Sequence, residues 1–228
     1  IGLSDSYNLC GALEFSEKIS KVGTQPIIGT QINLNSLNIF GKISLYATSE
    51  TGYKNLTKLS SKSYLKNQGI TEPSCNLEDL IENNEDLVLL TGNYKNFFGQ
   101  LFYKNKLKDF EQILNSLKNS FKDRLYIEIQ RHNEHQEKNF ENYLLNISKS
   151  LKLPLIATQE VFYLNENMYE AHDALVCIGE KSFVDDKNRF RYSNQHYLKS
   201  QEELEKLYSD IPEALENNYN FNLRFNFK

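Results

Sequence analysis

The chain has 228 residues, of which 39% are hydrophobic and 12% aromatic; this is enough to bury a core and excludes disorder along the whole chain. Lys and Arg number 26 against 30 Asp and Glu, a formal net charge of −4, which excludes the strongly basic class of autonomous nucleic-acid-binding proteins. No apolar run approaches the roughly 20 residues that span a bilayer, and the start lacks the features of a signal peptide. We therefore expect a cytoplasmic protein without membrane contact.

Apolar runs that alternate with amphipathic stretches predict α/β units around a largely parallel sheet. The periodicity predicts, in chain order, a strand ending at residue 3, a helix over 8–19, strands over 26–32 and 39–47, a helix over 52–66, a strand over 87–90, a helix over 107–121, a strand over 125–129, a helix over 140–151 and a strand over 155–158. Farther along, Ser200 and Glu203 form a capping-box pattern, and Pro212 suits the first turn of a helix. Because no linker or repeat interrupts this order, we expect one domain over residues 1–228.

Generic catalytic motifs are absent: the sequence has no phosphate loop, no GxGxxG, no nucleophile elbow and no HExxH. The three cysteines form no CxxC pair, which argues against a disulfide framework and a zinc knuckle. Longer strings carry the signal: LSDSYNLCGALEF (3–15), QPIIGTQINL (25–34), SETGYKNLTKLSSKSY (49–64), YIEIQRH (126–132), LPLIATQEVFYL (153–164), AHDALVCI (171–178) and YLKSQEELEKLYSDIPEAL (197–215). Together they resemble the PHP (polymerase and histidinol phosphatase) domain of the alpha subunit of bacterial DNA polymerase III, and TGYKNL, YLKS and DIPEAL are typical of the polymerase branch.

The resemblance implies an α/β fold, a distorted TIM-like βα barrel, within a much longer DNA-directed DNA polymerase. The family's first strand, with its HxH motif, would precede Ile1, so the barrel would lack that strand. The polymerase palm, with its Mg, would follow Lys228, so this fragment would have no catalytic residue and no cofactor of its own. The start on apolar residues without Met agrees with a fragment. The implied partners are the proofreading exonuclease subunit, the remainder of the alpha chain, and DNA through the holoenzyme.

Active members of the family bind a cluster of metal ions with His, Asp and Glu at the carboxyl ends of barrel strands. The resemblance places Ser6, Lys42 and Phe162 at positions where the family has His, and Gln31 where it has Glu. A hydroxyl and an amide are poor replacements for charged or imidazole ligands, an ammonium repels cations, and a phenyl ring offers no ligand atom. The sequence therefore predicts a degenerate metal site.

Two carboxylates, Glu128 and Glu160, remain at plausible ligand positions. Without further ligands, we expect them to be ordinary polar residues at strand ends, hydrogen-bonded or paired with Lys42. The alternative is a working metal-dependent phosphoesterase or 3′–5′ exonuclease that binds Zn or Mn through Asp5, Glu128, Glu160 and the upstream histidines. A stand-alone enzyme similar to histidinol phosphatase is a third possibility, which the polymerase-type strings oppose.

The histidines suggest no further site. His132 and His135 lie in the polar string QRHNEHQE, which predicts a solvated loop. We expect His172 at a helix start, hydrogen-bonded to Asp173, and His196 in a surface loop.

Residues 187–192 mix cations with aromatic side chains, a combination that can stack bases and pair phosphates. This stretch makes Lys187, Arg189 and Arg191 candidates for contact with DNA or with another subunit, although two aspartates directly before it dilute the positive charge.

Overall fold

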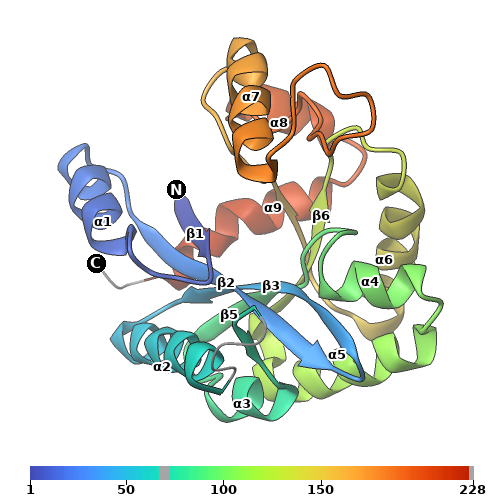
Figure 1. The fold of residues 1–228 in the computed structure, drawn as a ribbon. Coiled ribbons are helices and arrows are strands. Elements are labelled where there is room, and N and C mark those ends of the chain that lie inside the picture. Colours follow the sequence, from blue (N-terminus) through green and yellow to red (C-terminus); the bar gives the residue numbers. More distant parts are fainter. Residues whose placement is uncertain (67–71, 226–228) are drawn as a thin grey trace.

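The computed structural model describes residues 1–66 and 72–225, in which a curved sheet is surrounded by helices (Figure 1). The strands are β1 (Gly2–Ser6), β2 (Ile27–Ser36), β3 (Ile39–Ala47), β4 (Ser74–Cys75), β5 (Leu87–Leu90), β6 (Leu125–Gln130) and β7 (Leu155–Thr158). The helices are α1 (Ala12–Lys21), α2 (Glu50–Lys66), α3 (Leu77–Glu82), α4 (Phe97–Tyr103), α5 (Leu107–Phe121), α6 (Glu137–Leu151), α7 (Tyr169–Glu180), α8 (Gln201–Leu207) and α9 (Pro212–Phe221). None of these helices is long and apolar enough to cross a membrane.

The sheet follows the order β1-β2-β3-β5-β6-β7, with β4 paired to β2. The β1–β2, β2–β4, β5–β6 and β6–β7 pairs are parallel, whereas β3 runs antiparallel to both β2 and β5. Strands β1 and β7 form the two ends of this path, so the described part of the sheet curls without closing. This arrangement confirms the expected fold class, a distorted TIM-like barrel.

Local sequence explains the hairpin between β2 and β3. Its loop consists of Leu37 and Asn38, both with positive φ (53° and 59°), the conformation of the tight turn that matches the twist of paired strands.

Alternation along the strands separates two apolar clusters. In β5, Leu87 and Leu89 pack in the large cluster with the helices, whereas Val88 and Leu90 pack in a smaller cluster with Tyr126 and other inward residues. Glu128 lies two residues after Tyr126 in β6, so the strand period directs it to the same inner face. The geometry of the strands therefore places one carboxylate inside the curved sheet.

The predicted elements are mostly confirmed. The bounds of β3, β5, α5 and β7 match the predicted ranges, Ser200 and Glu203 form both bonds of a capping box, and Pro212 begins α9. The first helix begins later than predicted, at Ala12, because the Asn8 side chain accepts the Cys10 amide in a turn. The sequence pattern did not predict α3, which is short, or α4, whose buried residues leave no amphipathic period.

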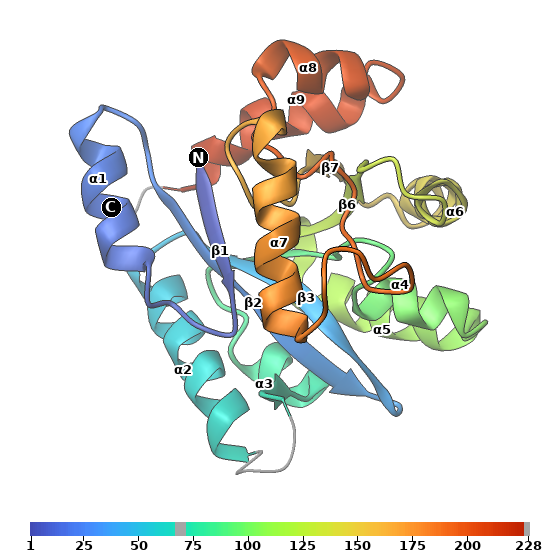
Figure 2. The same cartoon turned by 45° about the horizontal axis from the view of Figure 1, so that its top comes forward.

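Residues 181–200, here called the strap, connect α7 to α8 and contain no helix or strand. The two views place α7 over one end of the curved sheet, with the strap descending from it towards α4 (Figures 1 and 2). The loops after β5, β6 and β7 meet the strap at this end. Because carboxyl ends of parallel strands are where barrel folds place their sites, this region is the candidate site.

Candidate functional site

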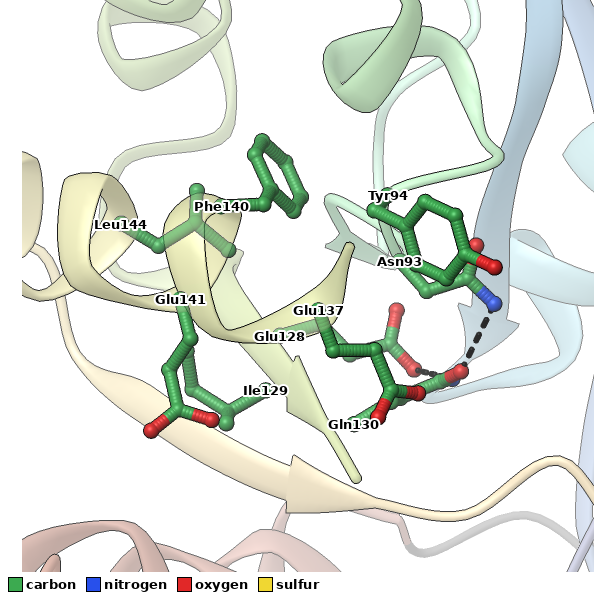
Figure 3. Close-up of a pocket in the computed structure, with 9 residues that line it drawn as sticks. All are labelled: Asn93, Tyr94, Glu128, Ile129, Gln130, Glu137, Phe140, Glu141 and Leu144. Atoms are coloured by element: carbon green, nitrogen blue, oxygen red, sulfur yellow. Dashed lines mark hydrogen bonds between the residues drawn. The ribbon is translucent and has the colours of Figure 1, made fainter. Parts of the chain in front are cut away.

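Glu128 is buried at the centre of the candidate site, with 3% of the residue exposed. Its Oε2 accepts the Gly92 amide at 2.8 Å, and its Oε1 accepts Gln130 Nε2 at 2.8 Å and the Thr158 hydroxyl. Burial raises the pKa of this carboxyl group. Figure 3 shows Gln130 between Glu128 and Asn93, which donates to the Gln130 oxygen at 2.9 Å.

These contacts use the Glu128 carboxylate for internal hydrogen bonds. Of the two alternatives expected for Glu128, internal hydrogen bonds are confirmed. Lys42 bonds to Ser6 instead, and the described residues show no ion pair between Lys42 and Glu128. The pocket drawn in Figure 3 has a volume of about 10 Å³, close to the roughly 10–15 Å³ that a single water requires.

His132 and His196 form a buried pair, each with 2% of the residue exposed. The prediction of a solvated position is therefore wrong for His132 and that of a surface position is wrong for His196, whereas His135 lies exposed in the loop, as predicted. The two rings stack at 4.1 Å with an interplanar angle of 5°. Nε2 of His132 accepts the Glu160 amide at 3.2 Å, which assigns the ring proton to Nδ1, 3.3 Å from Glu137 Oε1. His196 Nδ1 lies 3.1 Å from the Glu160 carbonyl oxygen, to which it donates. Burial lowers the pKa of His132.

Phe162 extends this pair into a column of rings. It stacks on His196 at 5.0 Å and on His172 at 5.3 Å and 6°. The Phe162 amide donates to the His196 carbonyl oxygen at 2.9 Å, which fixes the strap against the loop after β7. We call His132, His196, Phe162 and His172 the ring column.

The expected hydrogen bond between His172 and Asp173 is wrong. His172 lies within α7 and its Nδ1 has no hydrogen-bond partner in the described part of the chain. Asp173 is instead held by Arg189, whose guanidinium donates to both carboxylate oxygens. The paired Arg189 keeps the pKa of Asp173 below its usual range.

Lys42, Ser6 and Gln31 form a separate polar corner at the β1–β3 side. Lys42 Nζ donates to Ser6 Oγ at 2.9 Å, and the Ser6 hydroxyl donates to Gln31 Oε1 at 3.0 Å. The ammonium also lies 5.3 Å from the centre of the Tyr7 ring. Neighbouring Asp5 points to the opposite face of β1, beside Gly11. We call Lys42, Ser6 and Gln31 the lysine corner.

The candidate contact residues of the strap separate into two groups. Arg189 has a side chain only 3% exposed, within its ion pair, whereas Lys187 and Arg191 are exposed. The sequence reasoning missed Lys95, whose ammonium pairs with Glu134 at 2.8 Å. Their place in the sequence could have indicated both residues, because Lys95 and Glu134 each lie a few residues after a strand that ends at the site.

Comparison with known proteins supports one family. The family model for the PHP domain matches residues 1–132, more than half of the chain. The chain belongs to the PHP family. DNA polymerase III subunit alpha of Rickettsia bellii is 36% identical over 228 residues, covering 100% of this chain and 20% of the relative. The corresponding proteins of Caulobacter vibrioides and Vibrio cholerae are 36% and 33% identical, covering 95% and 99% of this chain.

The chain thus spans about a fifth of the length of these relatives. Among solved structures, a protein described as a metal-dependent phosphoesterase from Bifidobacterium adolescentis aligns with a TM-score of 0.50 and 11% identity, over 69% of this chain and 75% of its own. This similarity concerns the PHP fold alone.

The side chains that the resemblance places at the PHP metal positions make contacts with other groups of the chain. Within residues 1–66 and 72–225, no three His, Cys, Asp or Glu side chains are arranged to hold a metal ion. Lys42 brings a cation to the lysine corner, and Glu128 is fully hydrogen-bonded. Glu160 contacts the ring column mainly through its backbone, and its half-buried carboxylate lies 4.0 Å from His196 Nδ1. Phe162 is 39% exposed and stacks on His196.

Proposed function

We propose that residues 1–228 form one PHP domain of a DNA polymerase III alpha subunit in which the metal site is degenerate. In this proposal the domain is a scaffold and a docking surface for the proofreading exonuclease subunit. DNA-directed DNA synthesis, with its Mg, belongs to the remainder of the alpha chain, DNA is reached through the holoenzyme, and the protein acts in the cytoplasm. The fragment itself has no active site.

The ring column is the observation that carries the degenerate-site half of the proposal. Phe162, at a position where the resemblance places a ligand, stacks on both His196 and His172. The lysine corner adds a positive charge at a second position. Metal ions held close together need ligand charge to offset their mutual repulsion, and these substitutions remove it.

Exposed apolar side chains on α7 support the docking half. Leu175 and Ile178 are 63% and 76% exposed and lie three residues apart, on one face of the helix with Ala171. Phe183, just after the helix, is 78% exposed. Apolar groups gathered on one surface in this way are typical of protein contacts.

Metal analysis of the full-length alpha subunit, purified without added metal, tests the first half. We expect no stoichiometric Zn or Mn at the PHP domain and no nuclease activity that depends on it. The combined change Ser6→His, Gln31→Glu, Lys42→His and Phe162→His should raise affinity for these metals. Two or more bound metal ions per unaltered chain, with nuclease activity lost in Glu128→Ala or Glu160→Ala, would replace the proposal with the metal-dependent phosphoesterase or exonuclease.

Binding of the exonuclease subunit tests the docking half. We expect the full-length subunit to bind it equally with and without EDTA, because docking depends on surface complementarity. Leu175→Glu with Ile178→Glu should weaken binding, whereas Leu13→Glu, at a position 74% exposed on α1, should not. Loss of binding on chelation would indicate a structural metal instead.

A further inference from the structure

A groove of about 500 Å³ opens beside the ring column, outside the degenerate metal positions. Its walls come from three segments that are far apart in sequence: residues 94–95 after β5, 134–136 after β6, and 190–193 of the strap. Ligand pockets in proteins usually measure roughly 300–1,000 Å³ and occur at the carboxyl ends of parallel strands. The groove therefore has the size and place of a binding site for a small group.

Aromatic side chains dominate the strap wall. Phe190 is 46% exposed, and Tyr192 packs edge-on against its ring at 4.8 Å and 83°. The Lys95 ammonium lies 5.6 Å from the Phe190 ring and 5.5 Å from the Tyr192 ring. These contacts hold the Phe190 ring in place while leaving part of it open to solvent, as a stacking platform requires.

The lysine and the arginine that line the groove differ in their partners. Lys95 and Glu134 neutralise each other through their ion pair. Arg191 is exposed and donates to the Val184 carbonyl oxygen at 3.0 Å, which anchors the guanidinium. It pairs with no carboxylate of the residues that the structure describes, so its remaining N–H groups are available for an anion.

We infer that this groove binds single-stranded nucleic acid, with a base stacked on Phe190 and a phosphate held by Arg191. An aromatic platform next to a cation is the chemistry that binds unpaired bases, whereas the bases of a duplex stack on one another and are closed to such a ring. The volume of the groove and the net charge of −4 limit the contact to about one nucleotide. This inference goes beyond the proposed docking function and does not depend on it.

Photochemical crosslinking in the full-length protein tests the inference. The probe is an oligothymidine single strand that carries one 5-iodouracil, and adducts are mapped by mass spectrometry. We expect an adduct on Phe190 or Tyr192. Phe190→Ala should lower the adduct yield of residues 187–193 at least about fivefold at subsaturating probe, since stacking contributes a comparable factor per base. Arg191→Ala should lower the yield and its dependence on salt.

Phe183→Ala is the matched control, because Phe183 is a more exposed phenylalanine outside the groove and should leave the yield unchanged. Equal losses in Phe183→Ala and Phe190→Ala, adducts only elsewhere in the protein, or equal competition by duplex of the same sequence would overturn the inference. A photoreactive residue at position 192 that captures the exonuclease subunit, with no nucleic-acid adduct, would make the groove a protein contact instead.

Discussion

The lysine corner and the ring column lie at two groups of positions that the family resemblance assigns to metal ligands, and they differ in the contacts that their side chains make. The lysine corner is polar and partly exposed, and Lys42 supplies a positive charge. Lys42 of β3 donates to Ser6 of β1, which donates to Gln31 of β2. The ring column is aromatic and combines the buried His132 and His196 with the partly buried His172 and with Phe162, which is 39% exposed. It joins the strap to the loops after β6 and β7.

The two regions hold their segments together by different interactions. At the lysine corner, hydrogen bonds from Lys42 to Ser6 and from Ser6 to Gln31 join strands β1, β2 and β3. At the ring column, ring stacking and the burial of His132 and His196 join the strap to the neighbouring loops. Because buried groups contribute more to stability than exposed ones, we expect substitutions around the ring column to cost more than those in the lysine corner.

The largest loss in the free energy of unfolding should come from Glu128→Ala. The change leaves the Gly92 amide, Gln130 and Thr158 without their buried acceptor. The free energy of unfolding should fall by about 3 to 5 kcal/mol. Hydrogen exchange of the β6 and β7 amides measures this loss. Glu160→Ala, which removes a more exposed carboxylate, is the control and should cost less than about 1 kcal/mol. Equal losses would mean that the internal hydrogen bonds of Glu128 contribute little.

Phe162→Ala should have an intermediate effect. The change removes the ring that stacks on His196 and His172. It should lower the free energy of unfolding by about 1 to 3 kcal/mol and speed hydrogen exchange in the strap. Val161→Ala is a matched control, since Val161 and Phe162 are both 39% exposed and Val161 stacks on no ring. If both variants leave exchange in the strap unchanged, the ring column does not hold the strap.

Lys42→Met should lower the free energy of unfolding by about 1 kcal/mol, a smaller effect. The variant keeps the aliphatic stem but loses the hydrogen bond to Ser6 and the contact with the Tyr7 ring. Faster hydrogen exchange of β1 would report it. Lys54→Met, at an exposed ion pair on α2, should change the free energy of unfolding derived from hydrogen exchange by less than about 0.5 kcal/mol. A loss as large as that of Glu128→Ala would contradict the contrast between the two sides.

Periodic patterns predicted the framework because they report local burial, and β3, β5 and α5 follow them to the residue. The family resemblance singled out Lys42 and Phe162, and their predicted lack of a metal-ligand role stays a prediction. The string QRHNEHQE, however, is polar throughout, and nothing in it indicates that His196 folds back from the strap to cover His132. Lys95 was missed for the same reason, because its ring contacts come from residues far along the chain.

The last prediction concerns pH and the buried member of the ring column. Burial lowers the pKa of His132 in the folded protein, whereas the unfolded chain has the ordinary value of about 6.5. As pH falls below about 6.5, the unfolded chain therefore gains a proton that the folded protein does not, and stability is lost until the lowered folded pKa is reached. His132→Gln removes this dependence.

Hydrogen exchange between pH 7.5 and 5, corrected for intrinsic exchange rates, measures the effect. His132→Gln should be less stable than the unaltered protein near pH 7.5, because it loses the stack on His196, and the difference should shrink as pH falls. The exposed His135 provides the control, since His135→Gln should keep the pH dependence of the unaltered protein. A stability difference that stays constant or grows towards pH 5 would contradict this prediction. It would show that His132 takes up a proton as readily in the folded protein as in the unfolded chain, so that burial in the ring column does not disfavour the charged ring.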